Sequence, residues 1–137
     1  MDANIRTPIR SSGYRGFHLL LGILERVYGI VEGSDTAAAL GLLFGGCTVA
    51  TWYPITPATS LMETLISYAS RYRKNAQGQD QFAALQVEDE LAAITGVLGA
   101  GWTGARAVTT TSGPGLSLMA EAAGFAYYAE IPAVIWN

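Results

Sequence analysis

Apolar residues along this chain follow two alternating patterns, short unbroken runs and longer segments with helical spacing. The short runs are rich in β-branched residues, which predicts strands buried on both faces. We expect such strands at residues 47–53, 82–87, 106–111 and 131–136. Helical segments separate them, and repeated strand–helix units are typical of a parallel sheet. The sequence therefore predicts an α/β fold with a mostly parallel sheet.

The helical segments carry further signals. We expect helices at residues 37–44, at 60–74, from 88 onward and at 116–128. Ser60 and Glu63 match the S-x-x-E capping box that marks a helix start. In the third helix, Ala92, Ala93 and Gly96 keep one face small, so a second helix could approach it closely. The last helix is apolar nearly all round and is expected to be buried.

The composition excludes several classes of function. The formal charge is -3 and the isoelectric point is about 5.0, so the basic field that drives nucleic-acid binding is missing. The uncharged apolar stretch at residues 36–62 is interrupted by Gly45, Gly46, Pro54 and Pro57, so we expect no membrane span. Only 14% of the residues are charged, against roughly 25% in ordinary soluble domains, so we expect partners to cover part of the surface.

The single cysteine and the single histidine offer little site chemistry. Cys47 cannot form an internal disulfide, and one thiolate cannot hold an iron–sulfur cluster, so any cluster must sit on another chain. Its neighbours are small or apolar, which favours a buried thiol over a reactive one. His18 has no potential metal ligands at a suitable spacing.

Both ends of the chain are interpreted as parts of a longer protein. Residues 1–30 carry arginines and serines without a cleavage pattern, and we expect a linker or the remnant of an upstream domain. The domain itself is expected at residues 31–137. It stops inside the fourth predicted strand, at Asn137, which indicates truncation at the C-terminus. We expect the protein to be cytoplasmic.

Three turns that follow predicted strands carry the candidate site residues. In open parallel sheets, ligands bind at the carboxyl ends of the strands, where such turns meet. The first turn, Y-P-I-T-P at residues 53–57, holds the Thr56 hydroxyl between two prolines, which suits a rigid binding loop. On this motif alone, the prolines could equally serve only to keep strand and helix from merging.

The other two turns bring carboxylates and glycines to helix starts. The second turn, Q-V-E-D-E at residues 86–90, has three acids, and the helix dipole by itself accounts for at least two of them. Glu88 lies nearest the strand end, where loss of water would favour proton uptake and suit it to proton transfer. The third turn, T-S-G-P-G at residues 111–115, precedes a helix N-terminus that could receive an anion or bring backbone amides close to a ligand.

Five motifs, in matching order and spacing, resemble the 2-oxoacid:ferredoxin oxidoreductase family. They are V-E-G at 31–33, A-A-L-G at 38–41, Y-P-I-T-P at 53–57, Q-V-E-D-E-L-A-A at 86–93 and T-S-G-P-G-x-S-L-M at 111–119. The resemblance covers residues 31–137 and is greatest to alpha subunits associated with 2-oxoglutarate, including forms with a gamma domain fused upstream. Ser34 stands where many relatives have asparagine.

The resemblance implies the pyrimidine-binding domain of a thiamine diphosphate enzyme, which has a three-layer α/β/α fold. Glu88 matches the glutamate that hydrogen-bonds the cofactor's aminopyrimidine and promotes the imino tautomer that deprotonates the thiazolium carbon. Thr56 matches a threonine near the substrate carboxylate, and Pro54 matches a residue beside the pyrimidine. Ser112 and Gly113 are expected to line the same cleft.

The resemblance also implies that this chain is part of a larger enzyme. Its expected reaction is the coenzyme A-dependent oxidative decarboxylation of a 2-oxoacid, with electrons passing to iron–sulfur clusters and ferredoxin. A beta subunit is expected to hold the diphosphate, its Mg²⁺ and a 4Fe–4S cluster, and a gamma subunit or fused gamma domain is a further expected partner. The family's arginine near the substrate carboxylate would follow Asn137.

Three alternatives stay open from the residues alone. Y-P-I-T-P does not separate 2-oxoglutarate from pyruvate or a branched-chain 2-oxoacid. A transketolase-like thiamine enzyme also uses a glutamate, although the combination of Y-P-I-T-P with T-S-G-P-G argues against it. A noncatalytic module could use the small-residue helix faces only to dock a partner.

Overall fold

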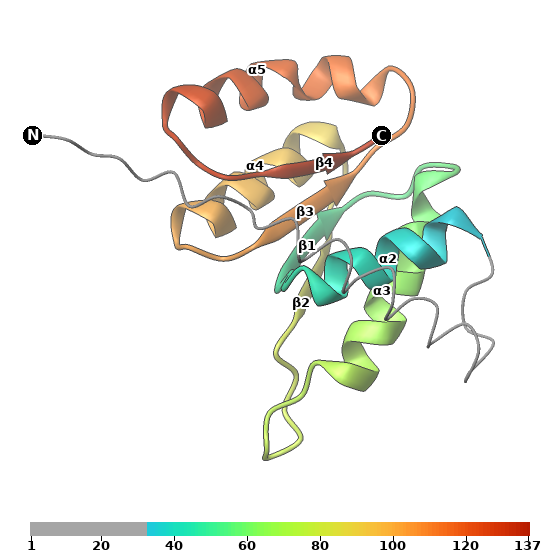
Figure 1. Ribbon diagram of the computed structural model, residues 1–137. Coiled ribbons are helices and arrows are strands. Elements are labelled where there is room, and N and C mark those ends of the chain that lie inside the picture. Colours follow the sequence, from blue (N-terminus) through green and yellow to red (C-terminus); the bar gives the residue numbers. More distant parts are fainter. Residues whose placement is uncertain (1–32) are drawn as a thin grey trace, which may run out of the picture. The chain divides into compact units, whose positions relative to one another are not determined.

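The computed structural model describes residues 33–137, of which Ser34–Asn137 form one compact unit (Figure 1). Helices and strands alternate in this unit as α2 (Ser34–Phe44), β1 (Val49–Trp52), α3 (Ala58–Tyr72), β2 (Ala83–Gln86), α4 (Glu90–Trp102), β3 (Ala107–Thr110), α5 (Gly115–Tyr128) and β4 (Val134–Trp136). The linker predicted at residues 1–30, His18 within it, and the start of the V-E-G motif lie outside the described residues.

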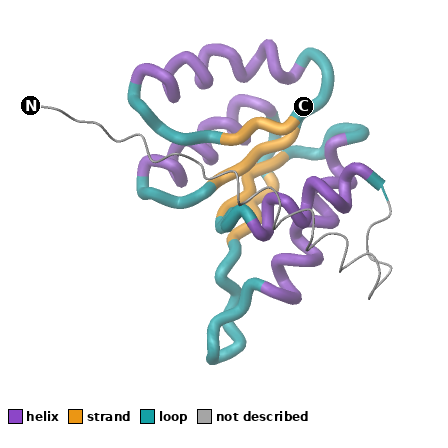
Figure 2. The backbone as a smooth tube through the Cα atoms, in the orientation of Figure 1, coloured by secondary structure: helices purple, strands orange, loops and turns teal. Residues whose placement is uncertain are grey.

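The strands form one parallel sheet in the order β2-β1-β3-β4 (Figure 2). Trp52 pairs with Gln86 of β2, and Thr110 pairs with Trp136 of β4, so the carboxyl ends of the strands meet at one edge. α2 and α3 cover one face of the sheet, and α4 and α5 cover the other (Figure 1). The predicted three-layer α/β/α fold is confirmed.

The core lies on both sides of the two central strands, β1 and β3. Successive residues of a strand point to opposite faces. Trp52 and Val108 therefore pack on the side of α2 and α3, whereas Tyr53 and Ala107 pack with Met119 on the side of α4 and α5. β3 is buried along its whole length, as predicted for a strand covered on both faces.

The capping box predicted at Ser60 and Glu63 does not form. α3 begins two residues before Ser60, at Ala58, with Pro57 at the N-cap position. The Ser60 hydroxyl is instead placed to donate to the Pro57 carbonyl oxygen, at 2.8 Å, or to the Asp35 carboxylate. Proline suits a helix start because its missing N–H would have no helical acceptor there. The helix therefore begins earlier than the S-x-x-E pattern predicts.

Two elements that were predicted to be buried are exposed wholly, in β2, or on one side, in α5. All four residues of β2 are exposed, because β2 is an edge strand that no described element covers fully. α5 packs through one side only and buries Gly115, Met119 and Ala126, while Phe125 is 51% and Tyr127 is 90% exposed. This unit therefore presents uncovered apolar surface. None of the described helices is long and apolar enough to cross a membrane.

At Gly96, the small face of α4 packs against strand β1, whereas Ala93 of the same face lies in one core cluster with Met119 of α5. A Cβ built on Gly96 would lie 2.6 Å from Cγ2 of Thr51 in β1. The Thr51 hydroxyl donates a hydrogen bond to the Ala93 carbonyl oxygen at 2.5 Å. The Thr51 side chain points from β1 toward α4 and fills the space beside Gly96.

Cys47 is a buried thiol, as predicted. It is 5% exposed, and its Sγ–H donates to the Val49 carbonyl oxygen at 3.3 Å. Burial raises the pKa of this thiol, with smaller opposing effects from that hydrogen bond and from Arg73. The thiolate that would react is therefore disfavoured.

Gly96→Ala should lower the free energy of unfolding by about 1–3 kcal/mol, because the new methyl group must displace the buried Thr51 side chain. Gly99→Ala is the matched control in the same helix, since a Cβ there meets nothing within 4 Å. The control should stabilise the chain by up to about 1 kcal/mol through helix propensity. Urea unfolding of both variants measures the difference. Equal stabilisation by the two substitutions would show that α4 does not sit on β1 as described.

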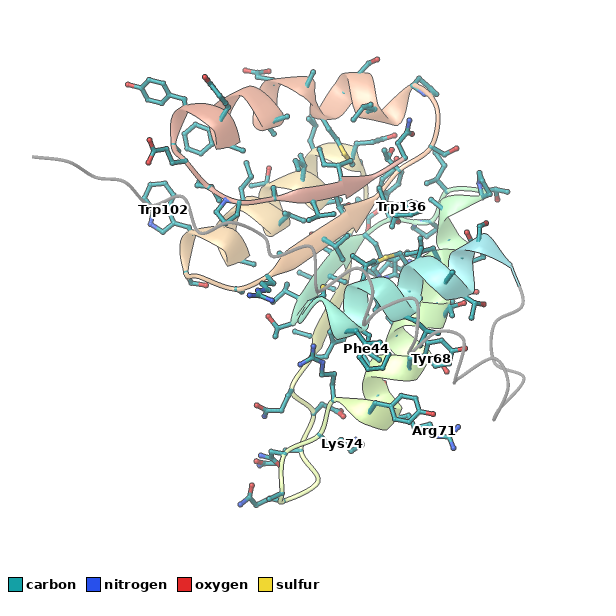
Figure 3. The ribbon with its side chains drawn as sticks, viewed as in Figure 1. Phe44, Tyr68, Arg71, Lys74, Trp102 and Trp136 are labelled. Atoms are coloured by element: carbon teal, nitrogen blue, oxygen red, sulfur yellow. The ribbon has the colours of Figure 1, made fainter. Side chains whose placement is uncertain are left out.

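Residues 1–137 produced alone should self-associate, because the other described residues leave large apolar side chains of α4 and α5 exposed. Figure 3 shows Trp102 projecting from the end of α4, and it is 69% exposed. Sedimentation velocity over a range of concentrations measures the association, and Trp102→Gln should shift it toward monomer. A wild-type chain that stays monomeric and unfolds cooperatively at every concentration would contradict this expectation.

Candidate active site

The carboxyl edge of the sheet gathers the three loops that carry the predicted site residues (Figure 1). Loops 53–57, 87–89 and 111–114 follow β1, β2 and β3, which are neighbours in the order β2-β1-β3. The Val87 N–H donates to the Trp52 carbonyl oxygen at 2.8 Å, so the chain after β2 stays joined to β1 until one residue before Glu88. The predicted meeting of the three turns is confirmed.

The loop after β1 is held from within by α3. The Ile55 N–H donates to Thr59 Oγ1 at 2.9 Å, and the Thr59 hydroxyl donates back to the Ile55 carbonyl oxygen at 3.0 Å. The peptide bond between Thr56 and Pro57 is cis. Pro54 and Thr56 are both exposed. The loop therefore presents these two predicted residues to solvent on a tethered backbone.

The three carboxylates after β2 have three different environments. Asp89 caps α4, since its Oδ1 accepts a hydrogen bond from the Ala92 N–H at 2.8 Å. Glu90 is half-buried and accepts a hydrogen bond from the Tyr53 hydroxyl at 3.0 Å. Glu88 is exposed, and within residues 33–137 its carboxylate has no hydrogen-bond or ion-pair partner. The loss of water expected at Glu88 is not produced by the described residues, because Glu88 lies beside β2, an edge strand whose residues are all exposed.

A buried hydrogen-bond network joins the bases of the three loops. The Tyr53 phenol oxygen lies 3.0 Å from Glu90 Oε1 and 2.7 Å from Thr111 Oγ1. The phenol has one proton and donates it to Glu90, so the Thr111 hydroxyl is the donor in the second bond. Tyr53 is 5% and Thr111 is 2% exposed, so the bond between them is shielded from water, whereas the bond to the half-buried Glu90 is only partly buried.

The environment of Tyr53 favours its neutral form. Burial raises the pKa of the Tyr53 phenol; the hydrogen bond with Thr111 opposes this rise, and the Glu90 carboxylate adds to it. The phenol therefore keeps its proton at neutral pH and remains a hydrogen-bond donor to Glu90.

The start of α5 sits directly on this network. A Cβ at Gly115 would overlap Thr111 Oγ1 and would lie 2.7 Å from the Tyr53 phenol oxygen, so the helix can approach only because this residue is glycine. In the preceding turn, Gly113 has a φ of +60°, in the left-handed region that favours glycine. Ser112 is half-buried and Gly113 is exposed. The T-S-G-P-G turn thus buries its threonine and last glycine and leaves its middle near the surface.

Sequence reasoning identified the outer residues of this edge and missed the buried network. Tyr53 and Thr111 directly precede predicted site residues, and Glu90 follows Glu88 by two residues, all within the same three motifs. A tyrosine at the end of a buried strand was an available signal, because a buried phenol needs a hydrogen-bond partner. In the described part of the chain, no group of three His, Cys, Asp or Glu side chains is arranged to hold a metal ion.

Comparison with known proteins identifies close relatives. Residues 41–137 match the protein family described as "Pyruvate flavodoxin/ferredoxin oxidoreductase, thiamine diP-bdg". The alpha subunit of 2-oxoacid:ferredoxin oxidoreductase 1 from Aeropyrum pernix is 43% identical over 108 residues, which cover 79% of this chain and 17% of that one. The 2-oxoglutarate synthase subunit KorA from Methanocaldococcus jannaschii is 42% identical over 101 residues, which cover 74% of this chain and 25% of that one.

A solved structure has the same fold. It is a 2-oxoglutarate:ferredoxin oxidoreductase from Magnetococcus marinus with 2-oxoglutarate, coenzyme A and succinyl-CoA bound. The TM-score is 0.64 at 39% sequence identity, and the match covers 74% of this chain and 16% of that one. This chain thus spans between 16% and 25% of the length of these three relatives. The resemblance seen in the sequence motifs is confirmed, and the chain belongs to the thiamine diphosphate-binding family of pyruvate flavodoxin/ferredoxin oxidoreductases.

Proposed function

We propose that this chain, through a domain at residues 31–137, forms the aminopyrimidine-binding wall of the thiamine diphosphate site in a 2-oxoacid:ferredoxin oxidoreductase. The observation that carries the proposal is Glu88, a carboxylate at a strand end that no other described side chain engages. It lies at the edge where the Y-P-I-T-P, Q-V-E-D-E and T-S-G-P-G motifs meet. A free carboxylate fits the ring nitrogen of an aminopyrimidine, which needs a hydrogen-bonding acid beside it.

The residues of this edge have separate proposed roles. Thiamine diphosphate supplies the carbanion chemistry that removes carbon dioxide from the 2-oxoacid. Glu88 holds a proton in a hydrogen bond to the aminopyrimidine, and Pro54 packs beside the ring. Ser112 and Gly113 line the same cleft. The Thr56 hydroxyl, exposed on its tethered loop, binds the substrate carboxylate.

The chain is proposed to act only within a larger assembly. The relatives are named as subunits, one of a 2-oxoacid:ferredoxin oxidoreductase and one of a 2-oxoglutarate synthase, and this chain spans a minor part of their length. A beta subunit is proposed to hold the diphosphate, Mg²⁺ and a 4Fe–4S cluster, since a cluster needs more thiolates than the single Cys47 offers. A gamma subunit or fused gamma domain, coenzyme A and ferredoxin complete the proposed set of partners.

The proposed substrate is 2-oxoglutarate, ahead of pyruvate or a branched-chain 2-oxoacid. The name of the KorA relative and the 2-oxoglutarate bound in the Magnetococcus marinus enzyme support this choice. The proposed reaction is its coenzyme A-dependent oxidative decarboxylation with ferredoxin as the electron acceptor.

Glu88→Gln in the complete assembly should reduce turnover at least ~10²-fold, because the amide cannot exchange a proton with the cofactor ring. Asp89→Asn is the matched control: it makes the same change of charge at the adjacent residue, and asparagine still caps α4. Ferredoxin reduction with 2-oxoglutarate and coenzyme A measures turnover. Near-normal activity of Glu88→Gln, or an equal loss in Asp89→Asn, would remove Glu88 from the mechanism.

Thr56→Val should lower kcat/KM for 2-oxoglutarate by about tenfold or more, the cost of losing a hydrogen bond to a charged group. The loss should appear mainly as a raised KM, while thiamine diphosphate affinity stays unchanged. Steady-state kinetics and a cofactor titration of the assembled enzyme measure the two effects. An unchanged KM would exclude Thr56 from substrate binding.

A further inference from the structure

Each member of the buried network belongs to the base of a different loop of the proposed site. Tyr53 is the first residue after β1, Thr111 is the first residue after β3, and Glu90 is the first residue of α4. The two bonds at the Tyr53 phenol oxygen, of 3.0 and 2.7 Å, therefore tie three separate chain segments at one point. Gly115 packs α5 onto the same point, which leaves the phenol no room to move toward α5.

Glu88 can be positioned only through the residues on either side of it, because its own carboxylate has no hydrogen-bond or ion-pair partner among the described residues. On one side, the Val87 N–H is bonded to the Trp52 carbonyl oxygen. On the other side, the hydrogen bond from Tyr53 holds Glu90, which lies two residues after Glu88. The direction of the Glu88 side chain is therefore set by the bond of Val87 to β1 on one side and by the bond of Glu90 to the Tyr53 phenol on the other.

The network also gives two neighbouring glutamates different surroundings. Glu88 and Glu90 lie two residues apart in the sequence. The hydrogen bond from Tyr53 turns the half-buried Glu90 inward, while Glu88 stays exposed at the edge. The Glu88 carboxylate is thereby left available for a ligand, whereas the Glu90 carboxylate is bonded within the protein.

We propose that Tyr53, with Glu90 and Thr111, is a positioning residue that fixes Glu88 in the geometry needed for proton exchange with the thiamine diphosphate ring. This inference rests on the proposed function and adds three residues that act through Glu88 without touching the cofactor. It predicts that loss of the phenol oxygen misplaces Glu88 while leaving substrate binding intact.

The test is Tyr53→Phe in the assembled holoenzyme, which removes one oxygen and keeps the ring. The first readout is the rate at which the proton on the thiazolium carbon of the bound cofactor exchanges with deuterium, measured by quenched NMR without substrate. This rate and kcat should both fall about tenfold or more, since small displacements of a catalytic group are costly. KM for 2-oxoglutarate should stay unchanged. Thr111→Val should behave alike, and Thr111→Ser, which keeps the hydroxyl, should restore most of the rate.

Thr51→Val is the control for a merely structural loss. It removes a buried hydrogen bond between β1 and α4, made by residues that lie outside the three loops. It should lower thermal stability as Tyr53→Phe does and change the exchange rate by less than about twofold. If Tyr53→Phe exchanges as fast as Thr51→Val, the positioning role is overturned. Glu88→Gln separates the two proposals, because normal exchange in that variant would instead overturn the proposed function on which this inference rests.

Discussion

One phenol hydroxyl, on Tyr53, connects the three loops on which the proposed site depends. The parallel strand order β2-β1-β3 brings the loops to one edge, but strand order alone leaves their side chains free to vary. The hydrogen bonds to Glu90 and Thr111 remove that freedom; the bond to Thr111 is buried and the bond to Glu90 is partly buried. The same network requires glycine at position 115, since any side chain there would collide with Thr111 and Tyr53. A short set of residues thus links the packing of the core to the arrangement of the edge.

The alternation of strand and helix patterns was sufficient to predict the fold, and motif positions were sufficient to predict which loops meet. Hydrogen bonds between distant residues were not predictable, because Tyr53 and Glu90 are 37 residues apart and Tyr53 and Thr111 are 58 apart. Local patterns also misplaced the start of α3, where Pro57 acts in place of the capping box. The burial predictions for β2 and α5 were wrong for another reason. An apolar pattern indicates which surface tends to be covered, but the described unit leaves β2 and one side of α5 exposed.

The uncovered surfaces are consistent with the proposed assembly. β2 lies beside the loop of Glu88, so a partner that covers this edge strand would also remove water from the carboxylate. That would supply the water-free environment that proton transfer needs and that the described residues do not provide by themselves. The exposed aromatic residues of α4 and α5 lie on the other face of the sheet from α2 and α3, and they offer a second area for contact. In this account, the chain contributes rigid loops and one free carboxylate, and a partner contributes enclosure.

The most direct test of this account is an experimental structure of the assembled enzyme with thiamine diphosphate bound. The decisive measurement is the distance from the Glu88 carboxylate to the ring nitrogen of the aminopyrimidine. The account predicts a hydrogen bond of about 2.6–3.2 Å, with Tyr53 still bonded to Glu90 behind it. A Glu88 carboxylate directed into solvent, with the ring contacted by another acid or bound at another edge, would contradict it.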